Sequence, residues 1–82
     1  MKKKFNLAGI SWVVKEQHLA ECGFTDPDTF TIAIHNSLPQ KSKEVTFYHE
    51  LVHAIMFTMG EINHDERFVE GFAQLLYQYE QQ

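Results

Sequence analysis

The first half of the chain alternates hydrophobic and polar residues, with the two-residue period that is typical of half-buried strands. Residues 5–7 and 10–14 follow this alternation, and its phase slips at Ala8-Gly9 between them. A glycine at such a slip predicts a tight turn or a bulge that joins two strands. The chain is therefore expected to begin with two short strands.

Residues 30–35 (FTIAIH) alternate cleanly and predict a half-buried antiparallel strand, whose apolar face is made by Phe30, Ile32 and Ile34. Residues 18–23 before it are expected to form a short helical turn or a loop. Residues 25–28 (TDPD) combine aspartate with proline and predict a turn. The first half of the chain therefore contributes about three strands.

Apolar residues recur at helical spacing after Ser42, which predicts a first helix in the second half of the chain. Ser42 is expected to cap the start of this helix, and Gly60 lies where a C-terminal cap belongs. Asn63 and Glu66 have the spacing of a capping box, so a second helix is expected to start near Asn63. This second helix carries an apolar stripe made by Phe68, Phe72, Leu75, Leu76 and Tyr79.

Strands followed by helices place the chain in the α+β class, with a small, mainly antiparallel sheet of about three strands packed on the first helix, plus a second C-terminal helix. The length of 82 residues allows a single domain over residues 1–82. A net charge of −4 argues against nucleic-acid binding, which depends on clustered lysine and arginine. Cys22 is the one cysteine, so an internal disulfide is excluded and a reducing compartment suits the chain.

The first four residues (MKKK) have the charge of a signal-peptide n-region, but polar residues and glycine interrupt the apolar run behind them. These four residues are expected to form a solvated tail. No run approaches the length of about 18 apolar residues that a transmembrane helix needs, so no membrane partner is expected. We therefore expect a cytoplasmic protein.

The residues that point to chemistry are His49-Glu50-Leu51-Val52-His53, an H-E-x-x-H motif inside the first predicted helix. Residues four apart on a helix lie one above the other, so both imidazoles can point at one metal ion. Glu50 is one position on, where its carboxylate lies beside the metal and can take a proton from a bound water. A catalytic Zn²⁺ also needs a third protein ligand and one open position.

Residues downstream must provide the third ligand, and the candidates are Glu61, His64, Asp65, Glu66 and Glu70. Glu66 and Glu70 lie four apart on one face of the second predicted helix. Two carboxylates stacked in this way repel each other unless a cation lies near them. One of them can bind the metal, while the other can accept the N–H of a ligand histidine.

Residues 48–54 (YHELVHA) followed by residues 66–73 (ERFVEGFA) resemble the gluzincin branch of zinc metallopeptidases. The resemblance is closest to the ImmA/IrrE-type peptidases and to their small phage-encoded relatives, the minigluzincins. It implies a zincin-like fold in which Glu66 is the third ligand and Glu70 braces a ligand histidine. The family has Asp or Asn at the brace position, where this chain has Glu, and it places an edge strand before the active-site helix.

The motif and the resemblance together lead us to expect a zinc-dependent peptidase that acts on a peptide or protein substrate. Glu50 would be the general base, and His64 and Tyr77 are candidate donors to a developing oxyanion. The strand at residues 30–36, at the sheet edge, would hold an extended substrate by strand addition. The alternative is a non-catalytic module, in which zinc only stabilises a short chain that binds or regulates a partner.

Overall fold

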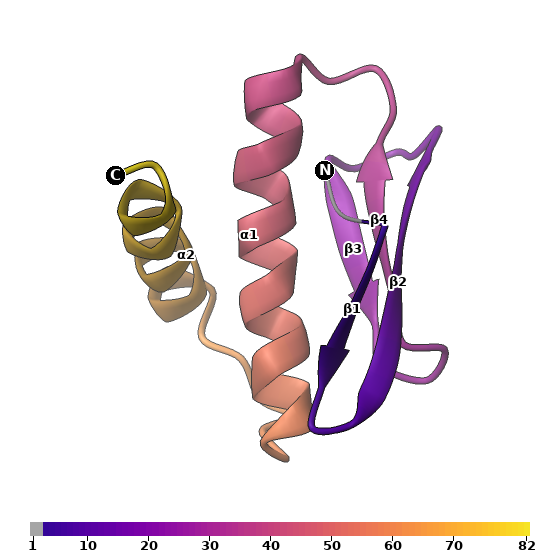
Figure 1. Ribbon diagram of the computed structural model, residues 1–82, viewed down its shortest axis with the longest axis vertical. Helices are drawn as coiled ribbons and strands as arrows, with labels where there is room; N and C mark the ends of the chain where they lie inside the picture. Colours follow the sequence, from indigo (N-terminus) through magenta and orange to yellow (C-terminus); the bar gives the residue numbers. More distant parts are fainter. Residues whose placement is uncertain (1–2) are drawn as a thin grey trace.

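The computed structural model describes residues 3–82 as three layers, with helix α1 (Gln40–Thr58) between the sheet and helix α2 (Glu66–Glu80) (Figure 1). The four strands form one sheet in the order β1-β2-β4-β3. Their bounds are Lys4–Leu7 for β1, Ile10–Gln17 for β2, Gly23–Asp26 for β3 and Thr31–His35 for β4. The α+β class and the small sheet with two helices are confirmed, while the sheet has one strand more than predicted.

The first two strands form a hairpin at the phase slip, where a tight turn or a bulge was predicted. β1 and β2 pair antiparallel, and Ala8 and Gly9 between them have φ angles of 51° and 80°. Positive φ at both central residues is the backbone of a type I′ turn, whose twist matches that of the flanking strands. The slip is therefore a tight turn.

The lysine-rich start of the chain joins this hairpin. Lys4 is the first residue of β1, and the Lys3 carbonyl accepts a hydrogen bond from the Val14 N–H at 2.8 Å, so the predicted tail is wrong for both lysines. Met1 and Lys2, the rest of that tail, lie outside the described residues. Within the described residues, neither helix has the apolar length that a membrane crossing would need.

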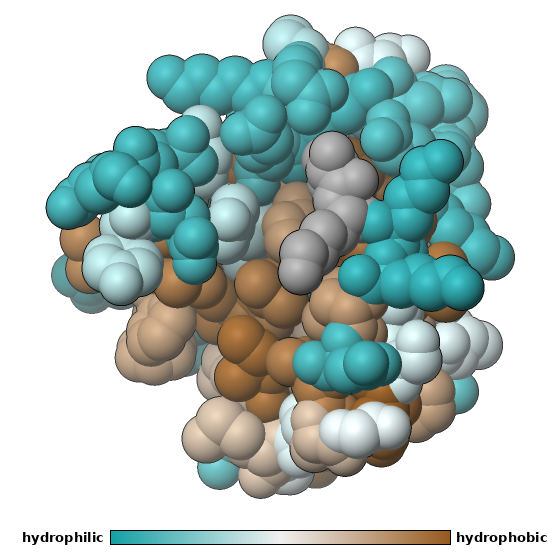
Figure 2. All heavy atoms as spheres, in the orientation of Figure 1, coloured by the Kyte–Doolittle hydropathy of each residue, from teal (hydrophilic) through white to brown (hydrophobic). Residues whose placement is uncertain are grey.

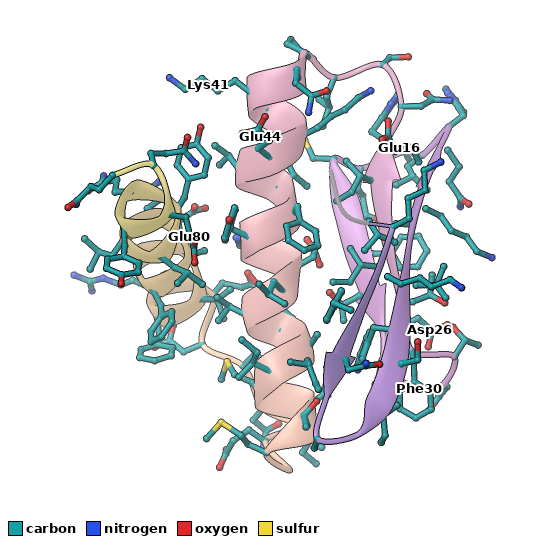
Figure 3. The ribbon with its side chains drawn as sticks, viewed as in Figure 1. Glu16, Asp26, Phe30, Lys41, Glu44 and Glu80 are labelled. Atoms are coloured by element: carbon teal, nitrogen blue, oxygen red, sulfur yellow. The ribbon has the colours of Figure 1, made fainter. Side chains whose placement is uncertain are left out.

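β4 lies inside the sheet, which corrects the antiparallel edge strand predicted at residues 30–36. It pairs parallel with β2 and antiparallel with β3, so β3 is the edge strand on this side. The predicted turn lies two residues further along, at residues 27–30, and Phe30 has a φ of 52° there instead of joining the strand face. Figure 3 shows Asp26 and Phe30 together at this turn.

The sequence pattern does not predict β3, because its four residues (GFTD) are weak strand formers by themselves. Glycine and aspartate are depleted in strands, and aspartate before proline favours a turn. The ladder to β4, from Gly23 opposite Ile34 to Asp26 opposite Thr31, provides the pairing that local propensity does not. The Asp26 carboxylate then accepts a hydrogen bond from the Asp28 N–H at 2.9 Å and begins the turn.

The core between the sheet and α1 is built from residues that alternate along the two central strands. Its buried members are Trp12, Val14, Ile32, Ile34 and Ala54, and Phe5, Leu7, Leu38 and Phe47 pack around them. Each large side chain that is fully buried here contributes about 1.5–3 kcal/mol. Ala54 on α1 is also fully buried, and its small side chain lets the helix lie close to the sheet.

Helix α2 packs on α1 through small residues and not through the predicted apolar stripe. Val69 and Ala73 are buried against Val52, with Tyr48 and Met56 around them. Four members of the stripe are between 49% and 70% exposed, namely Phe68, Phe72, Leu75 and Tyr79. Apolar surface gathers over the lower part of α2 and the adjoining end of α1 (Figure 2).

The face of α2 that meets α1 is the face that also carries Glu66 and Glu70. Both carboxylates lie close to histidines of α1, at distances given below. The orientation of α2 therefore brings its charged positions to α1 and leaves its larger apolar side chains in solvent.

The start of α1 differs from the prediction. The helix begins at Gln40 after Pro39, two residues before Ser42, and the Lys43 N–H donates to the Pro39 carbonyl at 2.9 Å. Because proline has no N–H, the start of the helix has one backbone donor fewer that needs a hydrogen-bond partner. No side-chain cap is formed there, and the predicted Ser42 cap is wrong.

The end of α1 follows the prediction. Gly60 has a φ of 88° directly after the helix, and its N–H donates to the Phe57 carbonyl at 3.0 Å. The Glu61 N–H donates to the Met56 carbonyl at 2.9 Å. This pair of bonds is a Schellman motif, which needs a residue that tolerates positive φ.

The start of α2 lies at Glu66 and is capped by Asp65, so the capping box predicted from Asn63 is wrong. The Asp65 side chain accepts a hydrogen bond from the Arg67 N–H at 3.0 Å. A carboxylate at this position satisfies a free backbone N–H and favours the positive end of the helix dipole. Glu66 therefore has its side chain free for the site.

Candidate metal centre

His49 and His53 lie one turn apart on α1 and face the first residue of α2. The Glu66 carboxylate lies between them, with 3.2 Å from its Oε2 to His49 Nε2 and 2.9 Å from its Oε1 to His53 Nε2. One ligand atom from each residue lies within 4.8 Å of the others, so this group could hold a metal ion. The structure thus brings together the histidine pair and one of the predicted third ligands.

The donor set and its spacing suit zinc. Zinc binds imidazole nitrogen and carboxylate oxygen at about 2.0–2.2 Å, so two ligands of a tetrahedral site stand about 3.3 Å apart. Each histidine nitrogen lies close to this separation from one oxygen of Glu66, at 3.2 Å from Oε2 for His49 and at 2.9 Å from Oε1 for His53. Burial lowers the pKa of His53, against the opposing charge of Glu66, and this favours the neutral imidazole that a metal requires.

Glu70 lies one turn further along α2, on the other side of the His49 ring. Its Oε2 is 3.6 Å from His49 Nδ1, whereas Glu66 faces His49 Nε2. A carboxylate near the outer nitrogen of a ligand histidine can orient the ring. Of the alternatives left open by the four-residue spacing, the geometry therefore places Glu66 in the group that could hold a metal ion and Glu70 on the outer side of His49.

Glu50 is 7% exposed and points from α1 towards β3 instead of joining the three possible ligands. Thr25 on β3 donates its hydroxyl hydrogen to Glu50 Oε1 at 2.7 Å, and the Glu50 backbone carbonyl is a second acceptor at 3.0 Å. Burial raises the pKa of Glu50, and the hydrogen bond from Thr25 opposes this shift. A carboxylate with a raised pKa beside a group that could hold a metal ion has the chemistry of a general base.

Gly23 lets β3 pass close to Glu50. A Cβ at this position would lie 2.8 Å from the Ala33 carbonyl oxygen, 2.8 Å from Thr46 Cγ2 and 3.4 Å from Glu50 Cγ. Only glycine fits between the neighbouring strand and α1 at this point. The close approach is what brings Thr25, two residues on, to the carboxylate of Glu50.

A cleft of about 550 Å³ lies over these residues, with β3 on one side and the loop at residues 61–65 on the other. A smaller hollow of about 270 Å³ adjoins it, since both are lined by Gly23, His49 and Glu50. The hollow continues along α1 past Val45 and Thr46. The total volume is within the range of ligand-binding sites.

His64 and Tyr77, the two predicted oxyanion donors, lie in different parts of the protein. His64 contacts His53, with 2.6 Å between their Nδ1 atoms, and its Nε2 is 2.6 Å from the Glu61 carbonyl oxygen. Both ring nitrogens of His64 are therefore engaged within the protein. The ring of Tyr77 packs against Tyr48 of α1, with ring centres 5.6 Å apart, between the two helices.

Sequence reasoning missed Thr25 and Gly23 as site residues. Both lie where the sequence predicts a loop and a turn, because nothing local indicates a strand in residues 23–26. Their place beside Glu50 results from the pairing of β3 with β4 and from the packing of β3 on α1. No motif spacing in the chain could have indicated this contact.

Comparison of the chain with protein-family models, with curated proteins and with solved structures gave no match.

Proposed function

We propose that the chain is a zinc-dependent peptidase of the gluzincin type, acting in the cytoplasm. The observation that carries the proposal is the convergence of His49, His53 and Glu66 beside the buried carboxylate of Glu50. The resemblance of residues 48–54 and 66–73 to the ImmA/IrrE-type peptidases and minigluzincins supports the same class. The chemical fit of two imidazoles and a carboxylate to zinc supports the choice of metal.

Zinc bound at this site would lower the pKa of a water towards about 7 and polarise the scissile carbonyl. Glu50 would take the proton of the attacking water and later give it to the leaving amine. Thr25 would hold the Glu50 carboxylate in place through the hydrogen bond of 2.7 Å. Glu70 would keep the His49 ring in the orientation that presents Nε2 to the metal.

The edge of β3 is the place where an extended peptide would bind, in place of the strand at residues 30–36. The His35 N–H donates to the Cys22 carbonyl at 2.8 Å, so residues 22, 24 and 26 direct their backbone groups towards β4. Because the pattern alternates in an antiparallel ladder, Gly23 and Thr25 direct their N–H and C=O groups away from the sheet. A substrate added to this edge would run along the cleft beside Glu50.

The alternative proposal is a non-catalytic module in which the metal only holds α1 and α2 together. A short chain with a small core gains most from such a metal. That role needs the two histidines and Glu66, and it gives no task to Glu50. The two proposals therefore separate at Glu50.

The test compares the parent protein with Glu50→Gln and with Glu44→Gln, a control on the same helix away from the site. Zinc is measured by elemental analysis, and cleavage of a diverse peptide library is followed by mass spectrometry. We expect equal zinc in all three proteins and a fall in cleavage of at least about 10²-fold in Glu50→Gln alone.

Each other outcome is decisive. A parent protein that takes up no zinc would overturn the metal centre. Equal cleavage by the parent and Glu50→Gln would overturn the role of Glu50. A zinc-loaded parent that cleaves no peptide would favour the non-catalytic module.

A further inference from the structure

His64, in the loop between the helices, meets His53 edge to edge. Their Nδ1 atoms are 2.6 Å apart, the ring planes differ by 16°, and the ring centres are 4.9 Å apart. The nitrogens are much closer to each other than the ring centres are, so the rings lie side by side in nearly one plane. This is the geometry of a hydrogen bond between two imidazoles and not of stacked faces.

The second nitrogen of His64 determines the direction of that hydrogen bond. Its Nε2 is 2.6 Å from the Glu61 carbonyl oxygen, which can only accept, so Nε2 must carry the hydrogen. A neutral imidazole has one N–H, and the Nδ1 of His64 is therefore the acceptor. It follows that His53 donates from its Nδ1.

A neutral His53 also has one N–H. Because its Nδ1 carries that hydrogen, its Nε2 has none. This nitrogen faces Glu66 Oε1 at 2.9 Å, so a lone pair points at a carboxylate oxygen. Two acceptors at this distance repel each other unless a proton or a metal ion lies between them. The chain of contacts from Glu61 through His64 to His53 thus prepares His53 Nε2 for a metal ion.

We propose that His64 is a positioning residue that fixes the tautomer of His53 and directs its Nε2 lone pair to the metal. The proposal rests on the proposed metal centre. It gives His64 a role behind a ligand, in place of the ligand and oxyanion roles considered from the sequence. The outer N–H of a ligand histidine is commonly held by a carboxylate, a carbonyl or a water, and here a second imidazole takes that place.

The loop holds His64 firmly enough for this role. Its ring packs on Phe57 of α1, with ring centres 4.3 Å apart. Glu61, whose carbonyl accepts from His64, is itself fixed by the hydrogen bond of its N–H to the Met56 carbonyl. The positive φ of Gly60 makes that bond possible, so the end of α1 fixes the acceptor for His64.

The first experiment uses the zinc-free protein at about pH 8, above the usual histidine range. Long-range ¹H–¹⁵N spectra report which nitrogen of each imidazole carries the hydrogen. We expect the parent to hold the hydrogen of His53 on Nδ1, and His64→Ala to lose this preference. A parent in which His53 carries its hydrogen on Nε2 overturns the proposal.

The second experiment measures zinc affinity by competition with a chelator for the parent, His64→Ala, His64→Asn and the control His18→Asn. The side-chain oxygen of asparagine can accept at the position of Nδ1, whereas alanine cannot. We expect His64→Ala to weaken zinc binding by about 10–100-fold, His64→Asn to recover most of it and His18→Asn to match the parent.

The melting temperature of the zinc-free proteins separates positioning from simple packing. We expect His64→Asn and the parent to melt alike without zinc. An unchanged zinc affinity in His64→Ala, or a loss that His64→Asn does not recover, overturns the proposal. A parent that binds no zinc overturns the proposed metal centre instead, and the tautomer spectra still decide the role of His64.

Discussion

Gly23 is the position where one added methyl group should damage both the fold and the site. The Cβ of Gly23→Ala would lie 2.8 Å from the Ala33 carbonyl oxygen and 2.8 Å from Thr46 Cγ2. Both separations are shorter than van der Waals contact, so something must shift. The first atom belongs to the backbone of an interior strand, and the second to a β-branched side chain that is stiff on its helix.

Overpacking of this kind costs about 1–3 kcal/mol. In a domain of this size, 1 kcal/mol moves the melting temperature by about 4–8 °C, so we expect Gly23→Ala to melt about 5–20 °C below the parent. The shift would also move β3 away from α1 and lengthen the hydrogen bond from Thr25 to Glu50, which is 2.7 Å in the parent. Peptide cleavage should fall with it.

Gly71 provides the matched control, because a Cβ there meets nothing within 4 Å. It lies inside α2, where alanine is favoured over glycine by about 0.5–1 kcal/mol, so Gly71→Ala should raise the melting temperature. Circular dichroism melts with and without zinc measure both variants. Adding Thr46→Ser to Gly23→Ala should restore part of the loss, since the contact with the Ala33 carbonyl remains. A Gly23→Ala protein as stable as the parent would refute the reasoning.

Three further predictions follow from the same structure. Glu66→Ala should weaken zinc binding more than Glu70→Ala in chelator competition, and the reverse order would exchange their roles. Glu16, on the side of the sheet that faces α1 (Figure 3), has its pKa lowered by a lysine at 2.7 Å. The stability it adds is therefore present above its unfolded pKa and lost as the pH falls through the folded one. In urea denaturation Glu16→Gln should cost at most about 1 kcal/mol at neutral pH and nothing in strong acid; a loss that persists in acid would exclude the ion pair as its cause. Val69→Ala should cost about 1–3 kcal/mol and Leu75→Gln at most about 0.5 kcal/mol, because the first side chain is fully buried and the second is 68% exposed; equal losses would contradict this orientation of α2.

The sequence by itself determined the features that depend on a few neighbouring residues. The hairpin at Ala8 and Gly9 follows from local turn chemistry, and so does the end of α1 at Gly60. The alignment of His49 and His53 follows from the helical period alone, because any helix places residues four apart on one face. The α+β class follows from the change of hydrophobic period between the two halves of the chain.

The tertiary structure alone decided which partners these elements meet. β3 is a strand because β4 pairs with it, and that pairing places Thr25 on Glu50 and moves the sheet edge away from residues 30–36. α2 carries an apolar stripe on one face and small and acidic residues on another. The sequence of this helix does not decide which of the two faces contacts α1. The contact uses the second face, because there Val69 and Ala73 allow close packing while Glu66 reaches both histidines. Such choices depend on residues far apart in the chain, where local propensity and spacing carry no information.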